Sequence, residues 1–118
     1  MSVQDLLNIV VKAANDKKAE DIVVLNLQGL SFVADYFVIC HGNTDKQVQA
    51  IVREIDEKVS EAGFIVKNRE GLTDARWVLV DLGDIIVHVF HRDERYYYNL
   101  EKLWGDAPVV DLESGLAQ

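Results

Sequence analysis

The feature that most constrains this 118-residue chain is a pair of apolar segments, residues 77–82 and 85–90, separated only by Gly83 and Asp84. Both segments are rich in Val, Ile, Leu and aromatic residues, a composition that favours β-strands. A glycine at the first position of a two-residue connection suits a type II′ turn, so we expect a tight antiparallel hairpin. Because the turn sets the register, it also decides which side chains share a face.

This register predicts one aliphatic face and one mixed face. The aliphatic face carries Leu82 opposite Ile85, Val80 opposite Val87, and Val78 opposite Val89. Such a face is expected to form the core against the helices. The mixed face carries Trp77 opposite Phe90, Leu79 opposite His88, and Asp81 opposite Ile86. It has two interpretations: another element covers it, or it is a protein-binding surface in which aromatic side chains are the anchors.

Helical and strand-like patterns alternate along the rest of the chain. Three helices are expected, beginning at Ser2, at Thr44 and at about residue 93, the last one ending at residue 104. The capping-box pairs Ser2 with Asp5 and Thr44 with Gln47 mark the first two starts. Further strands are expected at residues 22–27, 36–40 and 64–67. The predicted order is αββαβββα, an α+β (α/β) sandwich in which helices pack on a mixed five-stranded sheet.

The length of the chain suits one domain, which we expect to span residues 1–107, followed by a flexible tail over residues 108–118. Twenty acidic residues against twelve basic ones give a net charge of −8. This charge argues against free nucleic acid as a partner, because phosphate binding needs clustered Lys and Arg. It favours a basic protein partner instead.

Two further features bear on the location of the protein. Cys40 is the only cysteine, which excludes an internal disulfide and suits a reducing compartment. No apolar run approaches the roughly 20 residues that span a bilayer, so no membrane partner is expected. A cytoplasmic location follows as the expectation.

An enzymatic alternative is a nucleotidyltransferase that uses the turn at Gly42, Asn43 and Thr44 to hold a nucleotide at the start of a helix. Such an enzyme also needs paired carboxylates on one strand face to hold metal ions. Asp81 and Asp84 are three residues apart and lie on either side of the hairpin turn. We therefore expect neither catalysis nor a cofactor.

Other chemistry-bearing residues also have simpler interpretations. His88 and His91 point to opposite faces of a strand, so we expect a half-buried His88 and an exposed His91 rather than a shared metal site. Cys40 and the adjacent His41 also point apart, which predicts that Cys40 is a small buried hydrophobe and not a nucleophile. A run of three tyrosines, residues 96–98, is spread around a helix, so one or two of them are expected to pack on the sheet rather than stack on RNA bases.

A series of segments follows in order along residues 3–107: residues 34–39 (ADYFVI), Gly42, Gln47 with Val48, Glu70 with Gly71, residues 77–81 (WVLVD), residues 83–90 (GDIIVHVF), Tyr98, residues 100–104 (LEKLW), and Asp106 with Ala107. Together they resemble the ribosomal silencing factor family, which is also called RsfS, YbeB or Iojap. No single segment is diagnostic, but the ordered series is specific.

This resemblance implies a nucleotidyltransferase-like fold without the enzymatic chemistry. It implies a translation repressor that binds the large ribosomal subunit through ribosomal protein L-fourteen. Bound there, the protein would sterically block association with the small subunit when nutrients are short. The resemblance also implies a role in large-subunit biogenesis and a homodimer away from the ribosome. From the hairpin geometry, the mixed face is one candidate surface for this dimer, and a helix face is the alternative.

On the matched hairpin, we expect partner binding by residues of the mixed face, namely Trp77, Leu79, Asp81, His88 and Phe90. Glu70 and Asp74, on the loop before the hairpin, are expected to add acidic charge at the rim. The matched residues Asp35 and Tyr36 have a structural interpretation instead. This assignment follows from hairpin geometry, since the resemblance alone does not say which residues contact the partner.

Overall fold

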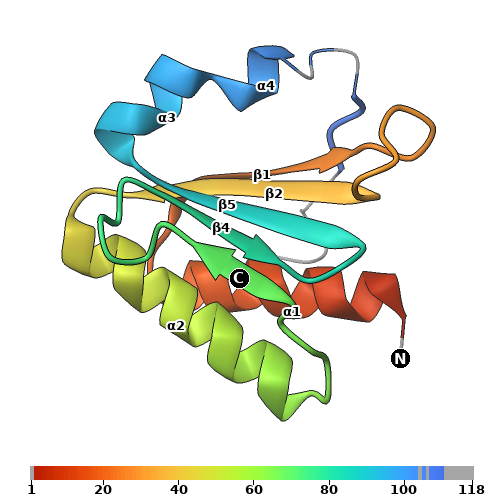
Figure 1. Ribbon diagram of the computed structural model, residues 1–118, viewed down its shortest axis with the longest axis horizontal. Helices are drawn as coiled ribbons and strands as arrows, with labels where there is room; N and C mark the ends of the chain where they lie inside the picture. Colours follow the sequence, from red (N-terminus) through yellow and green to blue (C-terminus); the bar gives the residue numbers. More distant parts are fainter. Residues whose placement is uncertain (1, 104, 106, 111–118) are drawn as a thin grey trace.

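The computed structural model describes residues 2–103, 105 and 107–110, which form a five-stranded sheet between two layers of helices (Figure 1). The elements are α1 (Val3–Asp16), β1 (Glu20–Asn26), β2 (Tyr36–Gly42), α2 (Asp45–Glu61), β3 (Asn68–Glu70), β4 (Trp77–Asp81), β5 (Ile85–His91), α3 (Arg92–Tyr98) and α4 (Leu100–Leu103). Helices α1 and α2 cover one face of the sheet, and α3 and α4 lie over the other. Among the described residues, no helix has both the length and the apolar character required to cross a bilayer.

The sheet is mixed, with strand order β1-β2-β5-β4-β3. Strands β2 and β5 pair in parallel, and the other neighbours pair antiparallel. The predicted α+β class, the five strands and their order along the chain are therefore confirmed. The hairpin register is also confirmed, since Trp77 lies opposite Phe90 and Leu79 opposite His88. Gly83 has the left-handed φ of +94° that the first position of a type II′ turn requires.

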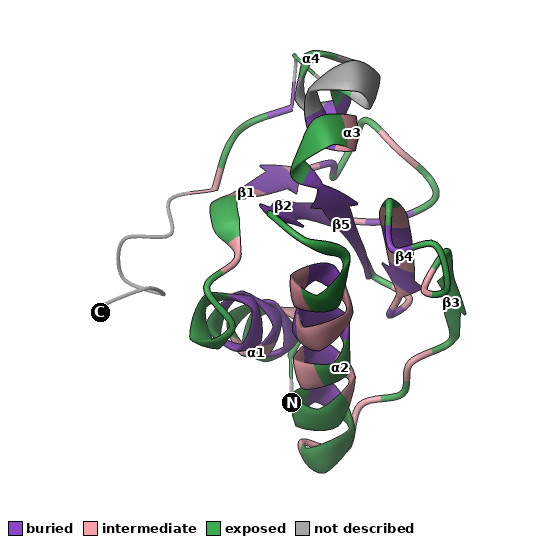
Figure 2. Ribbon diagram, turned by 90° about the vertical axis from the view of Figure 1, so that its left-hand side faces the viewer, coloured by how far each residue is buried: buried purple, intermediate pink, exposed green. Residues whose placement is uncertain are grey.

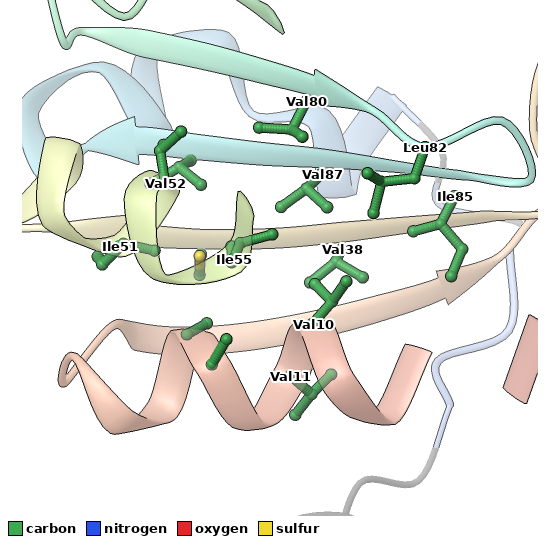
Figure 3. Packing of buried hydrophobic residues seen from close by; sticks show 14 of the residues in the cluster. Val10, Val11, Val38, Ile51, Val52, Ile55, Val80, Leu82, Ile85 and Val87 are labelled. Carbon is green, nitrogen blue, oxygen red and sulfur yellow. The ribbon is translucent and has the colours of Figure 1, made fainter. Parts of the chain in front are cut away.

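The aliphatic hairpin face forms the main core with α1 and α2 (Figure 3). Val80 and Val87 from the hairpin face Ile55 of α2, and Val38 of β2 faces Val10 of α1. These side chains are fully buried, as the helical spacing of apolar residues predicts. Cys40 lies in the same core, where burial raises the pKa of its thiol to about 12. Its predicted role as a small buried hydrophobe is therefore confirmed.

Side-chain caps begin both long helices where the sequence predicts. The hydroxyl of Ser2 accepts the Asp5 N–H, and the Asp5 carboxylate accepts the Ser2 N–H. At α2 the Thr44 hydroxyl accepts the Gln47 N–H, but Oε1 of Gln47 accepts from Asn43, one residue before the expected donor. The Nε2 group of Gln47 donates to the carbonyl of Lys18 at 3.0 Å. One side chain thus links the start of α2 to the chain just after α1.

The strand predicted at residues 64–67 is wrong in position, because β3 spans Asn68–Glu70. Phe64 and Val66 pack on the core while Ile65 between them is 77% exposed, which produces the strand-like alternation. Pairing with β4 begins only at Lys67, whose N–H donates to the carbonyl of Asp81 at 2.8 Å. The alternating burial of residues 64–66 therefore lies before the part of the chain that pairs with β4.

The single helix predicted after residue 93 is two short helices. Asn99 has a left-handed φ of +48° and ends α3, with its N–H donating to the carbonyl of Arg95. Asparagine is among the few residues that adopt this conformation readily. Helix α4 then begins at Leu100, and Trp104, the predicted helix end, lies outside the described residues.

Residues 108–110, at the start of the tail expected from the sequence, pair with the edge of the sheet. The carbonyl of Pro108 accepts the Asn26 N–H, and the Val110 N–H donates to the carbonyl of Val24. Val109 forms an antiparallel bridge with Leu25 between these two bonds. Residues 108–110 therefore cover part of the outer edge of β1, which would otherwise present unpaired backbone groups. The rest of the predicted tail, residues 111–118, lies outside the described residues.

Two glycines offer a test of backbone constraint, one next to the hairpin and one on the loop between β1 and β2. A Cβ on Gly71 would lie 2.2 Å from the carbonyl oxygen of Trp77, whereas a Cβ on Gly29 meets no described atom within 4 Å. Both have positive φ, so Gly29→Ala is expected to cost about 1–2 kcal/mol of unfolding free energy from conformation alone. Gly71→Ala is expected to cost a further ~2 kcal/mol because the backbone must shift. Urea unfolding of both variants measures the difference, and equal losses would contradict it.

Candidate functional site

The mixed hairpin face is half covered and half open. On β5, Phe90 and His88 are buried, at 0% and 4% exposure. On β4, Trp77, Leu79 and Asp81 are only partly buried. A second apolar cluster covers the β5 side, with members from β1, β2, α4 and the segment near Ala107. Another element therefore covers the β5 half of this face, as the first interpretation expects, while the β4 half stays partly accessible.

The indole of Trp77 on β4 is held by two neighbouring rings of β5, those of His88 and Phe90. Its Nε1–H donates to Nδ1 of His88 at 3.0 Å. Its ring stacks on Phe90, with centroids 5.1 Å apart and planes at 24°. Phe37 contacts His88 edge-on at 4.6 Å. Adjacent strands therefore determine the orientation of a side chain that remains partly accessible.

His88 is neutral at physiological pH, because burial lowers the pKa of its imidazole to about 4. Since Nδ1 accepts a hydrogen bond from Trp77, the ring proton is assigned to Nε2. This Nε2 atom is buried and has no hydrogen-bond partner among the described residues. A buried donor without an acceptor costs about 1–3 kcal/mol. His88 is thus more deeply buried than the half-buried side chain that the sequence suggested.

His91 is buried as well, which corrects the expectation that it is exposed. It is the N-cap of α3, and its Nδ1 accepts the Asp93 N–H at 3.2 Å. Its role is therefore to begin a helix. Within the part of the chain that the structure describes, no group of three or more His, Cys, Asp or Glu side chains is placed to hold a metal ion.

The open half of the face forms what we call the β4 patch: Glu70, Gly71, Trp77, Leu79 and Asp81. A shallow pocket of about 240 Å³ is lined by the first four of these residues. Figure 2 shows β3, with Glu70 at its end, as an exposed edge beside the partly buried β4. One oxygen of Asp81 accepts the Gly83 N–H at 2.8 Å, so this carboxylate also supports the hairpin turn.

The predicted rim residues lie on either side of Gly71. Glu70 ends β3, and Asp74 lies on the following loop; both are exposed. Glu70 lines the pocket and Asp74 does not. The structure therefore places Trp77, Leu79, Asp81 and Glu70 on one accessible patch, Asp74 outside the pocket, and His88 and Phe90 beneath the surface.

The turn at Gly42 is already occupied by the chain itself. The Asn43 N–H donates to Gln47 Oε1 at 2.7 Å, and the Gln47 N–H donates to the Thr44 hydroxyl. These are the kinds of helix N-terminal donors that would otherwise bind a phosphate. The backbone carbonyl of Asp84 accepts from the N–H groups of Asp35 and Tyr36, which supports the structural interpretation of those two residues.

Sequence reasoning missed the role of Arg95, which is only 2% exposed. Its guanidinium contacts Nδ1 of His41 at 2.9 Å and donates to the carbonyl of Glu20 at 3.2 Å, so it fastens α3 to the ends of β1 and β2. The pKa of His41 is lowered by burial and by the positive charge of Arg95. Within the charged run of residues 92–95 nothing distinguishes a buried arginine, and the neighbouring Glu94 pairs with Arg76. The side chains of residues 96–98 lie outside the described part of the structure.

Two other surface features contain none of the predicted residues. A groove of about 460 Å³ lies between α1 and α2, with Ile9 and Ala13 among its apolar lining and Lys12 and Glu61 among its charged lining. The loop between β1 and β2 exposes Phe32 to solvent together with Leu30 and Val33.

Comparison with known proteins agrees with this fold. The family model described as "Ribosomal silencing factor during starvation" matches residues 1–118. The ribosomal silencing factor RsfS of Bacillus subtilis (strain 168) is 62% identical over 118 residues, which cover 100% of both chains. A crystal structure from Bacillus halodurans superposes with a TM-score of 0.83 at 57% identity, covering 92% of this chain and 99% of that one. The structure of protein CV0518 from Chromobacterium violaceum gives 0.87 at 34% identity, covering 89% and 88%.

These matches define a class of protein, regulators that silence translation rather than enzymes. The chain belongs to the ribosomal silencing factor family. The family match extends over the residues beyond 107, which the resemblance in the sequence did not cover.

The buried imidazole makes stability depend on pH. The unfolded His88 takes up a proton near its ordinary pKa of 6.5, but the folded one does so only at about 4. The contribution of this neutral side chain is therefore complete above pH 6.5 and is lost as the pH falls towards 4, by about 3 kcal/mol. Urea unfolding at pH 7 and pH 4 should show a smaller loss for His88→Asn than for the unchanged protein. The same loss in both proteins would contradict the assignment to His88.

Proposed function

We propose that this protein binds the large ribosomal subunit through ribosomal protein L-fourteen and sterically blocks association with the small subunit. The observation that carries the proposal is the β4 patch, where a positioned indole lies beside an acidic rim on a member of a silencing family. Its place of action would be the cytoplasm, where the two subunits meet. The same contact would serve the role in large-subunit biogenesis that the family resemblance implies.

The β4 patch has the composition of a small protein-binding site. Trp77 and Leu79 offer apolar surface that is only partly buried within the chain. Binding energy at protein interfaces is concentrated in a few aromatic anchors, especially tryptophan, that fill pockets on the partner. Trp77 meets this description. It lines a shallow pocket together with Leu79 and Gly71, where a side chain of a partner can approach it.

The charges around the patch suit a basic partner. Glu70 and Asp74 are exposed, and the protein as a whole carries a net charge of −8. Complementary charge at the rim of an interface increases the association rate more than it slows dissociation. We therefore propose that the aromatic patch supplies most of the affinity and that the acidic rim steers the approach.

Silencing by this route needs no chemistry. A body with Cα extents of 33 × 32 × 29 Å, bound on the joining face of the large subunit, occupies space that the small subunit needs. Repression then depends only on occupancy, and hence on affinity and concentration. This agrees with membership in a family of regulators. It also agrees with the turn before α2, where side chains of the protein itself bind two of the backbone N–H groups.

Co-sedimentation with purified large subunits tests the proposal, followed by addition of small subunits. We expect stoichiometric binding and fewer joined ribosomes. Trp77→Ala should weaken binding by about 2 kcal/mol or more, roughly 30-fold, because an anchor is lost. Absence of binding to active large subunits would reject the proposal, and unchanged affinity of Trp77→Ala for isolated L-fourteen would remove Trp77 from the contact.

Two variants serve as matched controls in this experiment. Phe32→Ala removes an exposed aromatic side chain on the loop between β1 and β2, outside the β4 patch, and should leave affinity unchanged. The double variant Glu70→Gln, Asp74→Asn should slow association and reduce its salt dependence, whereas Trp77→Ala should act on dissociation. A loss of affinity in Phe32→Ala as large as in Trp77→Ala would place the contact elsewhere.

We also propose a homodimer away from the ribosome that uses the β4 patch. A patch that contains Trp77 and Leu79 would then be covered in the free protein and released on binding. Sedimentation equilibrium should show a dimer that Trp77→Ala weakens and that added L-fourteen converts to a one-to-one complex. A dimer that persists unchanged in the complex would show that another surface, such as a helix face, forms it.

A further inference from the structure

The orientation of Trp77 has a structural cause that packing alone does not supply. A partly exposed indole on a strand near the sheet edge has solvent on one side and can rotate about its side-chain bonds. Here the ring lies on Phe90, and its Nε1–H reaches Nδ1 of His88 at 3.0 Å. The stacking holds the plane of the ring, and the hydrogen bond fixes which edge of the ring points inward.

A histidine at this position lowers the stability of the fold, because it buries a polar ring. It lies between Leu79 on β4 and Ile39 on β2, with Phe37 against its ring, so its surroundings are apolar. Its Nε2 atom is buried and unpartnered among the described residues. A phenylalanine would fill a similar space without burying an unpaired donor. Of the two ring nitrogens that phenylalanine lacks, only the Nδ1 acceptor makes a hydrogen bond among the described residues, and it receives the indole N–H of Trp77.

We propose that His88 is a positioning residue that holds the indole of Trp77 in its binding orientation and so prepares the β4 patch for the ribosomal partner. This inference rests on the proposed function of the patch. His88 does not touch the partner, since only 4% of it is exposed. Its contribution is that Trp77 does not have to be ordered when the partner binds, which lowers the entropic cost of association.

Two substitutions separate the acceptor from the ring. His88→Phe keeps an aromatic ring and removes the acceptor, whereas His88→Asn loses the ring and keeps an acceptor oxygen at the Nδ1 position. We expect His88→Phe to bind large subunits about tenfold more weakly, an effect of the size expected for ordering one large side chain. His88→Asn should recover most of this loss. If His88→Phe does not fold, His88→Leu replaces it as the variant without an acceptor.

A double-variant cycle distinguishes positioning from general packing. In a Trp77→Phe background there is no indole N–H for His88 to accept, so His88→Phe should change affinity by less than twofold. An equal weakening by His88→Phe in both backgrounds would overturn the proposal, because it would show that His88 acts through the fold rather than through Trp77. Affinity equal to that of the unchanged protein in His88→Phe would overturn it as well.

The indole itself provides a readout that does not need the ribosome. In ¹H–¹⁵N spectra the Trp77 indole signal is identified by its disappearance in Trp77→Phe. We expect its N–H to be protected from exchange with solvent in the unchanged protein and in His88→Asn, and to exchange rapidly in His88→Phe. If the unchanged protein does not bind ribosomes but the three proteins show this pattern of exchange protection, the proposed function is rejected and the positioning of Trp77 is supported. Equal protection in all three proteins would reject the positioning itself.

Discussion

The pairing of β4 with β5 across the turn at Gly83 and Asp84 is the constraint on which the other features depend. It sends alternate side chains of the hairpin to opposite faces, so that Val78, Val80, Val87 and Val89 enter the core between the sheet and α1 and α2. The same register brings Trp77 over Phe90 and Leu79 beside His88 on the other face. A slip of one residue would exchange the two faces and remove both the core and the patch.

The two strands of the hairpin differ because of where they lie in the sheet. Strand β5 is central, between β2 and β4, and the chain leaves it at His91 directly into α3. Helix α3 packs back over β5 and β2, where Arg95 fastens it near Glu20 and His41. Helix α3 therefore covers the sheet on the side of β1 and leaves β4 partly exposed. An aromatic surface thus remains accessible on a strand whose position is set by a rigid core.

This arrangement suits binding better than catalysis. Two polar groups of this face are engaged within the chain, since Asp81 supports the turn and the Nδ1 of His88 accepts from Trp77. At the turn of Gly42, the N–H groups of Asn43 and Gln47 are bound by the side chains of Gln47 and Thr44. What the surface offers a partner is a held aromatic ring and exposed carboxylates. A regulator that acts by occupying space requires no more than this.

By itself, the sequence determined the hairpin, its register and the capped starts of α1 and α2, because each depends on residues close together in the chain. It also placed Trp77, Leu79 and Asp81 on one face of the hairpin together with His88 and Phe90. Only the tertiary structure decided that His88 and Phe90 lie beneath Trp77, that His91 is buried, and that residues 108–110 continue along β1. Those outcomes depend on which distant segment covers which surface, here α3 through Arg95 and the chain after Ala107. Local periodicity carries no information about such contacts, because the partners are brought together only when the sheet is complete.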